Sequence, residues 1–351
     1  MIGSALVLVL AGAPALRVGS PHHFIEPGFA VQGRLSWRDT LDGGGASTLE
    51  LKRLRFSLRG SLDDGQLTFG VQLNTTPAAL ELLDLWLGWT PTRGVTLKAG
   101  QLKTPFTRHR AGSFQTLAMT DWSVASVHFG AERQVGALVE LSSGAASSAF
   151  GVFTGTNARA SFARGLADLY GEHLINPSDF RVKASPEAIH PELVARTGVA
   201  FTGAPVRTAA FFSAAWDLRP TYAVDFQLRL APELKLEWRT LTLELIGYAG
   251  WARDQQGALM AASLGATAEL SWQLHPRWLL ATRWSRVDLL PAARLDAQAH
   301  AEGAGQLRAS QEVGLGLTVS VLSALRFQLE GAWLHADADE LRFRAQLQLA
   351  L

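Results

Sequence analysis

Alternation of apolar and polar side chains at every second residue recurs along this chain and constrains its fold more than any single motif. In LKRLRFSLRG (51–60), leucines and one phenylalanine share one face of an extended strand, because successive side chains point to opposite faces. The other face carries Arg53, Arg55 and Arg59. About sixteen such segments follow one another, separated by turns rich in Gly, Pro, Asp and Ser. The segments span 28–37, 51–60, 66–74, 80–89, 95–103, 134–141, 149–155, 194–201, 207–216, 223–238, 241–251, 262–272, 278–284, 312–320, 325–333 and 341–351. This pattern predicts an all-β chain.

The apolar faces decide between a soluble and a membrane-embedded sheet protein. A soluble sandwich would also contain buried central strands and charged edge strands. A barrel in a bilayer needs an apolar outer face on every strand around a polar lumen. Tryptophans near the strand ends fit the aromatic girdles of such a barrel; they are Trp37, Trp89, Trp216, Trp238, Trp251, Trp272, Trp284 and Trp333. We therefore expect a transmembrane antiparallel β-barrel of about 16 strands whose arginines face a water-filled lumen.

The connections between the expected strands alternate between short and long. The long ones are 107–133, 156–193 and 291–310. Short turns on one rim and longer loops on the other are typical of outer-membrane barrels, where they are periplasmic and extracellular respectively.

Composition excludes several classes of function. Charged residues make up only 18% of the chain, below the roughly 25% of an ordinary soluble domain. A net charge of +1 gives no indication of nucleic-acid binding. The absence of cysteine excludes a disulfide framework, a thiolate metal site and a cysteine nucleophile.

The first residues resemble an export signal. The stretch 2–10 is apolar, and small residues at 11–15 offer a cleavage site. We expect a signal peptide over 1–15, whose missing positive start indicates a truncated beginning, followed by a barrel over 24–351.

Five motifs of the first half stand out: Arg53-Leu54-Arg55, LLDLWLGWTP, LKAGQLKTPF, AERQVGALVEL and AFGVFTGTNAR. They resemble the phosphate-selective porin O/P family of Gram-negative bacteria, and the terminal strand continues the likeness. The resemblance implies a homotrimeric sixteen-stranded porin in the outer membrane, in contact with lipid and lipopolysaccharide. It also implies that the third extracellular loop, at about 107–133, folds inward and narrows a channel in which arginines pass small anions. The chain departs from the usual bacterial pattern by ending in Leu351 rather than in an aromatic residue.

The alternation and the resemblance together predict two groups of functional residues. The expected pore-lining anion path comprises Arg34, Arg53, Arg55, Arg59, Lys98, Lys103, Arg342 and Arg344. The expected constriction-loop residues are Arg108, His109, Arg110 and Arg133. Alternation also places about nine carboxylates inside, and many of these would pair with the basic residues across neighbouring strands. A like-signed ring drives ion selectivity, whereas a paired lattice does not.

The functional hypothesis is a passive diffusion channel for small anions, with phosphate as the preferred solute of the family. Two alternatives stay open: a general-diffusion porin with little ion selectivity, and a non-conducting structural barrel. An outer-membrane hydrolase is a third class, but G-x-S-x-G, H-E-x-x-H and P-loop patterns are absent. We therefore expect no enzyme activity, no cofactor and no metal site.

Overall fold

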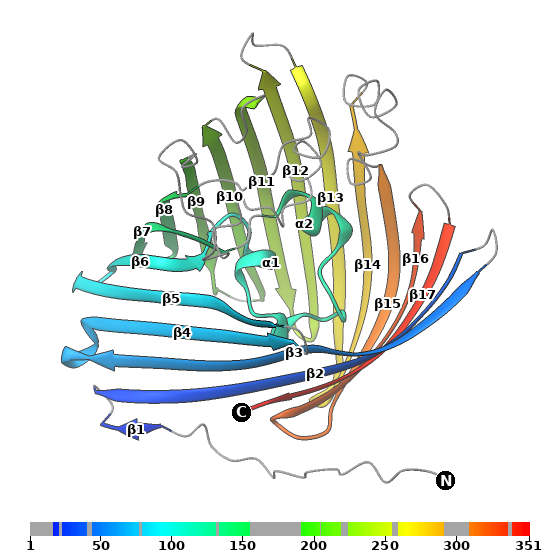
Figure 1. The fold of residues 1–351 in the computed structure, drawn as a ribbon, viewed down its shortest axis with the longest axis horizontal. Helices are drawn as coiled ribbons and strands as arrows, with labels where there is room; N and C mark the ends of the chain where they lie inside the picture. The colour runs from blue at the N-terminus through cyan, green and yellow to red at the C-terminus, as the bar shows by residue number, and fades with distance from the viewer. Residues whose placement is uncertain are drawn as a thin grey trace.

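Strands that pair with their neighbours in chain order build the wall of this protein. The computed structural model describes residues 17–20, 23–40, 44–76, 79–130, 133–154, 191–203, 205–218, 224–254, 259–290, 309–335 and 339–351. Within them, β2 to β17 form one antiparallel sheet, and β17 pairs back onto β2 from Glu340↔Thr40 to Ala350↔Ala30 (Figure 1). This pairing closes a 16-stranded barrel, which confirms the expected fold class and strand number.

Most strands begin earlier or end later than the segments expected from the sequence. Their bounds are β2 Phe24–Thr40, β3 Gly45–Leu62, β4 Leu67–Thr76, β5 Ala79–Thr92, β6 Val95–Lys103, β7 Arg133–Ser143, β8 Ala146–Phe153, β9 Glu192–Phe201, β10 Val206–Leu218, β11 Val224–Trp238, β12 Leu241–Asp254, β13 Leu259–His275, β14 Trp278–Leu289, β15 Ser310–Ser320, β16 Leu325–His335 and β17 Asp339–Ala350. A two-residue strand, β1 (Val18–Gly19), pairs with the start of β2. The expected signal peptide and most of the two loops at 156–193 and 291–310 lie outside the described residues.

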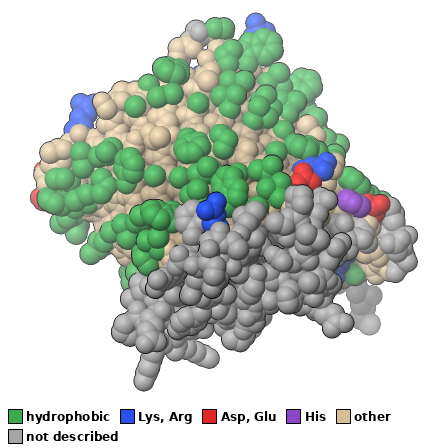
Figure 2. Space-filling view, turned by 90° about the horizontal axis from the view of Figure 1, so that it is seen from above, with side chains coloured by type: hydrophobic (Ala, Val, Ile, Leu, Met, Phe, Trp, Pro, Cys, Tyr) green, Lys and Arg blue, Asp and Glu red, His purple; other side chains and the backbone are tan. Residues whose placement is uncertain are grey.

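The outer face is apolar, as the alternation predicts. On β5, Leu85, Leu87 and Trp89 are 50%, 71% and 49% exposed, an exposure that suits lipid rather than water. Figure 2 shows hydrophobic side chains spread over this surface. Trp89 and Trp238 lie near the short turns, whereas Trp37 and Trp216 lie toward the opposite rim, so exposed tryptophans occur at both ends of the wall. No helix among the described residues is long and apolar enough to cross a bilayer.

A β-bulge in β3 changes the face that strict alternation would assign to Lys52. On β3, Arg53 pairs with Gln32 and Leu51 pairs with Gly33, so Lys52 is the extra residue of the bulge. Alternation alone would place Lys52 on the outer face with Leu54. The bulge instead brings its positive charge close enough to act on Asp121 inside the barrel.

The connection between β6 and β7 folds into the barrel, as Figure 1 shows for its helices α1 (Arg108–Ala111) and α2 (Val124–Phe129). A 3₁₀ turn, η2 (Phe114–Thr116), lies between them. Thr107, Ser113 and Ser123 cap the three turns, because each side chain accepts a hydrogen bond from a backbone N–H of the following turn. We call residues 104–130 the constriction loop.

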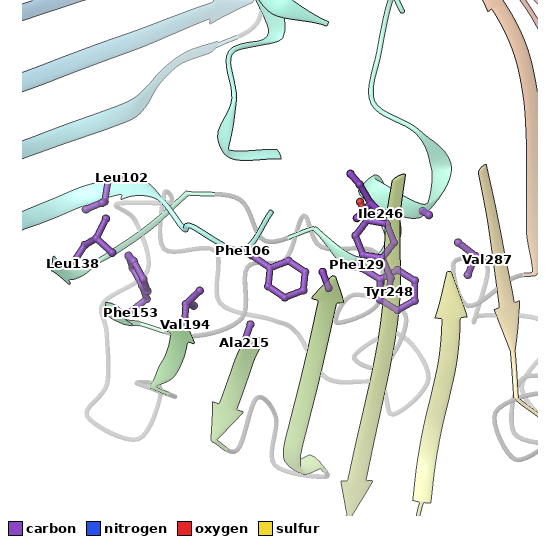
Figure 3. Packing of buried hydrophobic residues seen from close by; sticks show 12 residues of the cluster. Leu102, Phe106, Phe129, Leu138, Phe153, Val194, Ala215, Ile246, Tyr248 and Val287 are labelled. Atoms are coloured by element: carbon purple, nitrogen blue, oxygen red, sulfur yellow. The ribbon is translucent and has the colours of Figure 1, made fainter. Parts of the chain in front are cut away.

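A hydrophobic core forms between the constriction loop and the wall (Figure 3). Phe106 and Phe129 of the loop are fully buried, and the Phe129 ring stacks on Tyr248 of β12 with centroids 5.2 Å apart. The wall beneath carries small residues: a Cβ on Gly265 would lie 2.5 Å from the Phe129 ring, and a Cβ on Gly316 would lie 2.7 Å from Met119 Sδ. The loop can approach this closely because those wall positions have no side chain.

Candidate functional site: the lumen and its constriction loop

The constriction loop is fastened to one side of the lumen through its backbone. Arg108 N donates to Glu233 Oε2 of β11 at 2.8 Å, and Val124 N donates to Glu312 Oε2 of β15 at 3.1 Å. Thr120 N and Oγ1 both donate to Glu330 Oε2 of β16, at 2.8 and 2.7 Å. Three carboxylates that alternation places inside the barrel therefore hold a loop in position.

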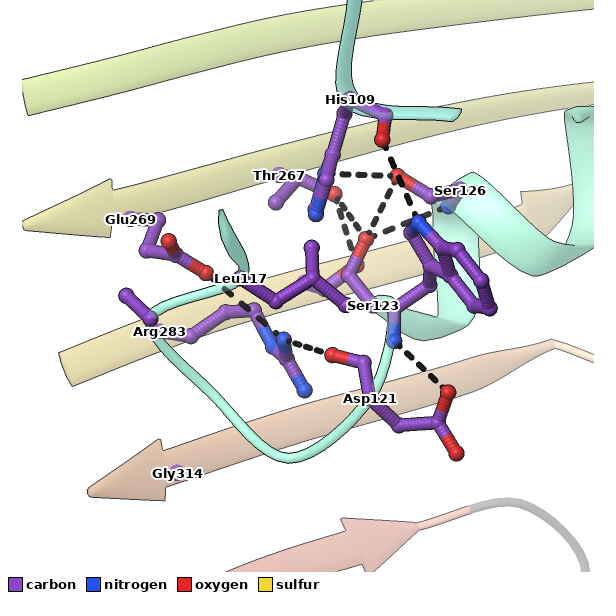
Figure 4. Close-up of polar contacts among 12 residues, drawn as sticks. His109, Leu117, Asp121, Ser123, Ser126, Thr267, Glu269, Arg283 and Gly314 are labelled. Carbon is purple, nitrogen blue, oxygen red and sulfur yellow. Dashed lines mark hydrogen bonds and ion pairs between the residues drawn. The ribbon is translucent and has the colours of Figure 1, made fainter. Parts of the chain in front are cut away.

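Wall arginines add to this fastening by donating to loop carbonyl oxygens, Arg229 of β11 to Phe129 O at 3.1 Å and Arg34 of β2 to Thr120 O at 2.7 Å. Arg283 of β14 donates to Asp121 O at 2.8 Å and also pairs with Glu312 and Glu269 (Figure 4). Arg326 of β16 donates to the carbonyl oxygens of Gln115 and Leu117. The loop thus covers the wall from β11 to β16, and the remaining space in the lumen faces the opposite side.

Two histidines lie in the loop, of which His128 is buried and His109 is half-buried. His109 Nδ1 lies 3.1 Å from Ser126 Oγ, and His128 Nε2 lies 3.3 Å from Ser263 Oγ. Burial, with Arg283 and Arg110 nearby, lowers the pKa of His109 to about 3. Burial lowers the pKa of His128 to about 4. Both imidazoles are neutral at pH 7, so His109 adds no positive charge to the constriction there.

Asp121 at the middle of the loop faces the basic residues of β2 and β3. Its Oδ2 lies 3.0 Å from Arg34 Nη1, and its Oδ1 lies 3.6 Å from Arg53 Nη2. Burial raises the pKa of the Asp121 carboxyl, but Arg34, Arg53 and Lys52 together hold it well below its usual range. Asp121 is therefore ionised, and it neutralises part of the expected anion path.

A cavity of about 520 Å³ lies on the uncovered side of the lumen, between the loop and β2 to β7. Its basic lining residues are Arg55, Arg59, Lys103 and Arg133, and its acidic lining residues with side-chain carboxyls are Glu26 and Asp84. The structure thus brings together four of the residues that the sequence assigned to the two functional groups.

Each basic side chain of this cavity has a defined contact. Arg59 Nη2 lies 3.5 Å from Glu26 Oε1, with both side chains partly open to the lumen. Arg133 pairs with both oxygens of Asp84, at 2.7 and 3.2 Å. The Lys103 amine donates to the carbonyl oxygens of Ala111 and Gly112.

Aromatic rings hold several of the arginines as well. The Arg55 guanidinium carbon lies 4.6 Å from the Phe114 ring centroid, and that of Arg53 lies 4.9 Å from the same centroid. On the other side, Trp122 contacts both Arg53 and Arg110, at 5.2 and 4.5 Å. A row of guanidinium groups and rings therefore runs from the cavity into the constriction loop.

The other expected path residues lie apart from this cavity and are ion-paired. Lys98 Nζ lies 2.8 Å from Glu140, Arg342 Nη2 lies 3.0 Å from Glu340, and Arg344 Nη1 lies 3.3 Å from Glu330. Among the expected loop residues, Arg108 is exposed and Arg110 is buried. The sequence suggested that Arg133 belongs to the loop, but Arg133 is the first residue of β7.

Sequence reasoning did not single out the buried glutamines of the lumen face, of which Gln328 donates to the loop carbonyl oxygen of Leu117 at 3.3 Å. Gln32, Gln328 and Gln346 are buried on the lumen face, and Gln346 Oε1 accepts hydrogen bonds from Arg34 at 3.0 and 2.9 Å. Alternation places such glutamines inside, but it gives no sign of a contact between residues more than 300 positions apart.

Known proteins match the first half of the chain by sequence and nearly all of it by fold. Residues 30–196 match the family model "Phosphate-selective porin O and P". Over this span, just under half of the chain, the sequence is similar to that family. The protein is accordingly a porin, a non-enzymatic channel of the Gram-negative outer membrane. Among curated proteins, none matches this porin significantly.

Solved porin structures share the fold at low sequence identity. The anion-selective porin from Comamonas acidovorans aligns with a TM-score of 0.66 and 10% identity, covering 94% of this porin and all of that chain. OprB of Pseudomonas putida aligns with a TM-score of 0.67 and 10% identity, covering 93% and 94% of the two chains. OmpT of Vibrio cholerae, in a trimer form, gives a TM-score of 0.58 and 10% identity over 94% and 100% of the two chains.

Proposed function

We propose that this porin is a passive diffusion channel with a preference for small anions, inorganic phosphate among them. The observation that supports this most directly is the cavity on the open side of the constriction loop. Four basic side chains, Arg55, Arg59, Lys103 and Arg133, line it against the two side-chain carboxylates of Glu26 and Asp84. Guanidinium groups match phosphate and carboxylate oxygens in geometry as well as in charge. The family match and the anion-selective neighbour point in the same direction.

A second candidate function, general diffusion with little ion selectivity, is favoured by the ion pairs of the lumen. Lys98, Arg342 and Arg344 each have a carboxylate partner within hydrogen-bonding or ion-pairing distance. A lattice of opposite charges stiffens the wall without creating a net field. The two functions differ in one measurable quantity, the ratio of anion to cation permeability.

Single-channel recording of the refolded porin across a salt gradient tests the proposal. We expect a reversal potential that favours anions, and a saturable fall in chloride current when phosphate is added. Arg55→Gln should lower the anion-to-cation permeability ratio, by about fourfold if one unit charge acts on both ions at about 10 Å in an unscreened medium as polar as water. Arg286→Gln is the matched control, because Arg286 lies on the outer face of β14 between the inward-facing Ser285 and Val287. An unselective wild-type channel without phosphate block would favour general diffusion instead.

We further propose that the porin assembles as a homotrimer in contact with lipid and lipopolysaccharide. The support for the assembly is the family match and the trimer form of OmpT. Mass measurement of the detergent-solubilised porin before and after heating tests it, with a mass of one chain before heating as the contradicting result.

A further inference from the structure

Asp121 occupies the position that a solute anion would take among the basic residues of β2 and β3. Each of its carboxylate oxygens faces a different guanidinium group, Oδ2 toward Arg34 at 3.0 Å and Oδ1 toward Arg53 at 3.6 Å. Lys52 and Arg344 are the next positive charges that act on it. The wall thus forms an anion site, and the loop itself supplies the anion.

Contacts on either side of this carboxylate also hold the loop in position. On one side, Thr120 donates twice to Glu330, at 2.8 and 2.7 Å. On the other side, Val124 N donates to Glu312 at 3.1 Å, and Arg283 donates to the backbone oxygen of Asp121 itself at 2.8 Å. Because these contacts flank the side chain, the carboxylate contributes mainly charge.

This charge lies close to the proposed anion path. Arg53, which faces Asp121, and Arg55, which lines the cavity, contact the same Phe114 ring at 4.9 and 4.6 Å. Phe114 itself lines the cavity. A charge within about 10 Å of a permeating ion still acts on that ion at moderate salt, since the Debye length is about 10 Å at 0.1 M.

We infer that Asp121 is a tethered carboxylate that fills an anion site formed by Arg34, Arg53 and Lys52, and that it limits the anion preference of the channel. The inference rests on the proposed function and names a residue that sets its selectivity. A free carboxylate or inorganic phosphate has the charge and the oxygen geometry to enter the same site when the Asp121 side chain is removed.

The first test is Asp121→Asn, which removes the charge and keeps the shape. Reversal potentials of the full-length refolded porin in a gradient of potassium chloride near 0.1 M should show an anion-to-cation permeability ratio at least about twofold above wild type, for one unit charge at about 10 Å. Asp288→Asn is the matched control, because this aspartate pairs with Arg286 on the outer face of β14. Barrel closure of each variant is checked by its heat-dependent gel mobility. In the double variant Asp121→Asn/Arg53→Gln, the anion-to-cation permeability ratio should return to the wild-type value.

The second test is Asp121→Ala, which also vacates the space. Acetate and inorganic phosphate are titrated separately, with chloride current as the readout. We expect a saturable response in Asp121→Ala that is absent from wild type and Asp288→Asn. A response to phosphate without one to acetate supports the site and assigns it to phosphate, and a response to acetate supports a site for carboxylates.

Two results would overturn the inference. One is a permeability ratio in Asp121→Asn equal to that of Asp288→Asn, with no saturable response in Asp121→Ala. The other is a rise in conductance without a change in selectivity, which would mean that Asp121 holds the loop rather than limits anions. Failure of the proposed function gives a different pattern, since the wild-type channel itself would then be unselective or cation-selective.

Discussion

At the scale of single residues, the lumen uses its arginines in three different ways. Arg283 and Arg326 donate to loop carbonyl oxygens and therefore serve the architecture. Arg59 and Arg133 face the cavity with a carboxylate beside them. Arg55 contacts the Phe114 ring, which orders its guanidinium group. The same residue type thus has different partners at different places in the lumen.

Phe129→Ala tests how strongly side-chain packing holds the loop. The ring is fully buried against Tyr248 and above Gly265, so its removal leaves a cavity and should weaken loop docking by about 3–5 kcal/mol. We expect larger current fluctuations and additional conductance levels in single-channel records. Phe150→Ala, at an outward position that is 48% exposed, should leave the records unchanged. Equal records for the two variants would show that the polar contacts alone hold the loop.

At the scale of elements, the constriction loop and the wall beneath it are matched in shape. The wall lacks side chains at Gly265 and Gly316, where the loop inserts Phe129 and Met119. The bulge in β3 adds Lys52 to the basic residues that face the loop from the other side. Apolar contacts and hydrogen bonds therefore seat the loop on the wall from β11 to β16, and basic residues of β2 and β3 face it from the other side.

Two histidines of the loop, the buried His128 and the half-buried His109, predict that loop docking weakens in acid. Burial lowers the pKa of His128 to about 4, and burial with Arg283 and Arg110 lowers that of His109 to about 3, whereas an undocked imidazole titrates near 6.5. Between these values the undocked loop binds more protons than the docked loop, so docking is fully stable above about pH 6.5 and weakens as the pH falls toward 4. For His128 the loss at pH 4.5 is on the order of 2 kcal/mol.

Current fluctuations measured at pH 7.5 and pH 4.5 check this. They should grow on acidification in wild type and grow less in His128→Gln, whose amide can still meet Ser263. Asp121 does not contribute in this range, because its lowered pKa keeps it ionised. Fluctuations that are the same at both pH values would contradict the prediction.

At the scale of the whole molecule, the barrel contains a nearly balanced set of charges whose imbalance is local. The chain carries a net charge of only +1, and the excess of basic over acidic side chains on the open side of the loop lies in one cavity. Any anion preference should therefore come from a short segment of the path rather than from the whole barrel.

Salt concentration tests this local origin. Raising potassium chloride from 0.1 M to 1 M shortens the Debye length from about 10 Å to about 3 Å, so the anion-to-cation permeability ratio should fall toward one. The conductance itself should rise with salt in the usual way, and the Arg55→Gln variant should show a weaker dependence. A ratio that does not change with salt would point to a direct binding site rather than to a screened field.

The sequence by itself determined the barrel, its strand number and the faces of its strands. These follow from alternation, which depends only on neighbouring residues and survives errors of a few residues at strand ends. It also placed Arg53, Arg55 and Arg59 on the lumen face, while their transport roles stay predictions.

Only the tertiary structure decided which lumen charges are paired. Arg34 meets Asp121 and Gln346 because a loop crosses the barrel and the last strand closes on the first. Such partners depend on register, a bulge and the path of the loop, none of which a local pattern contains.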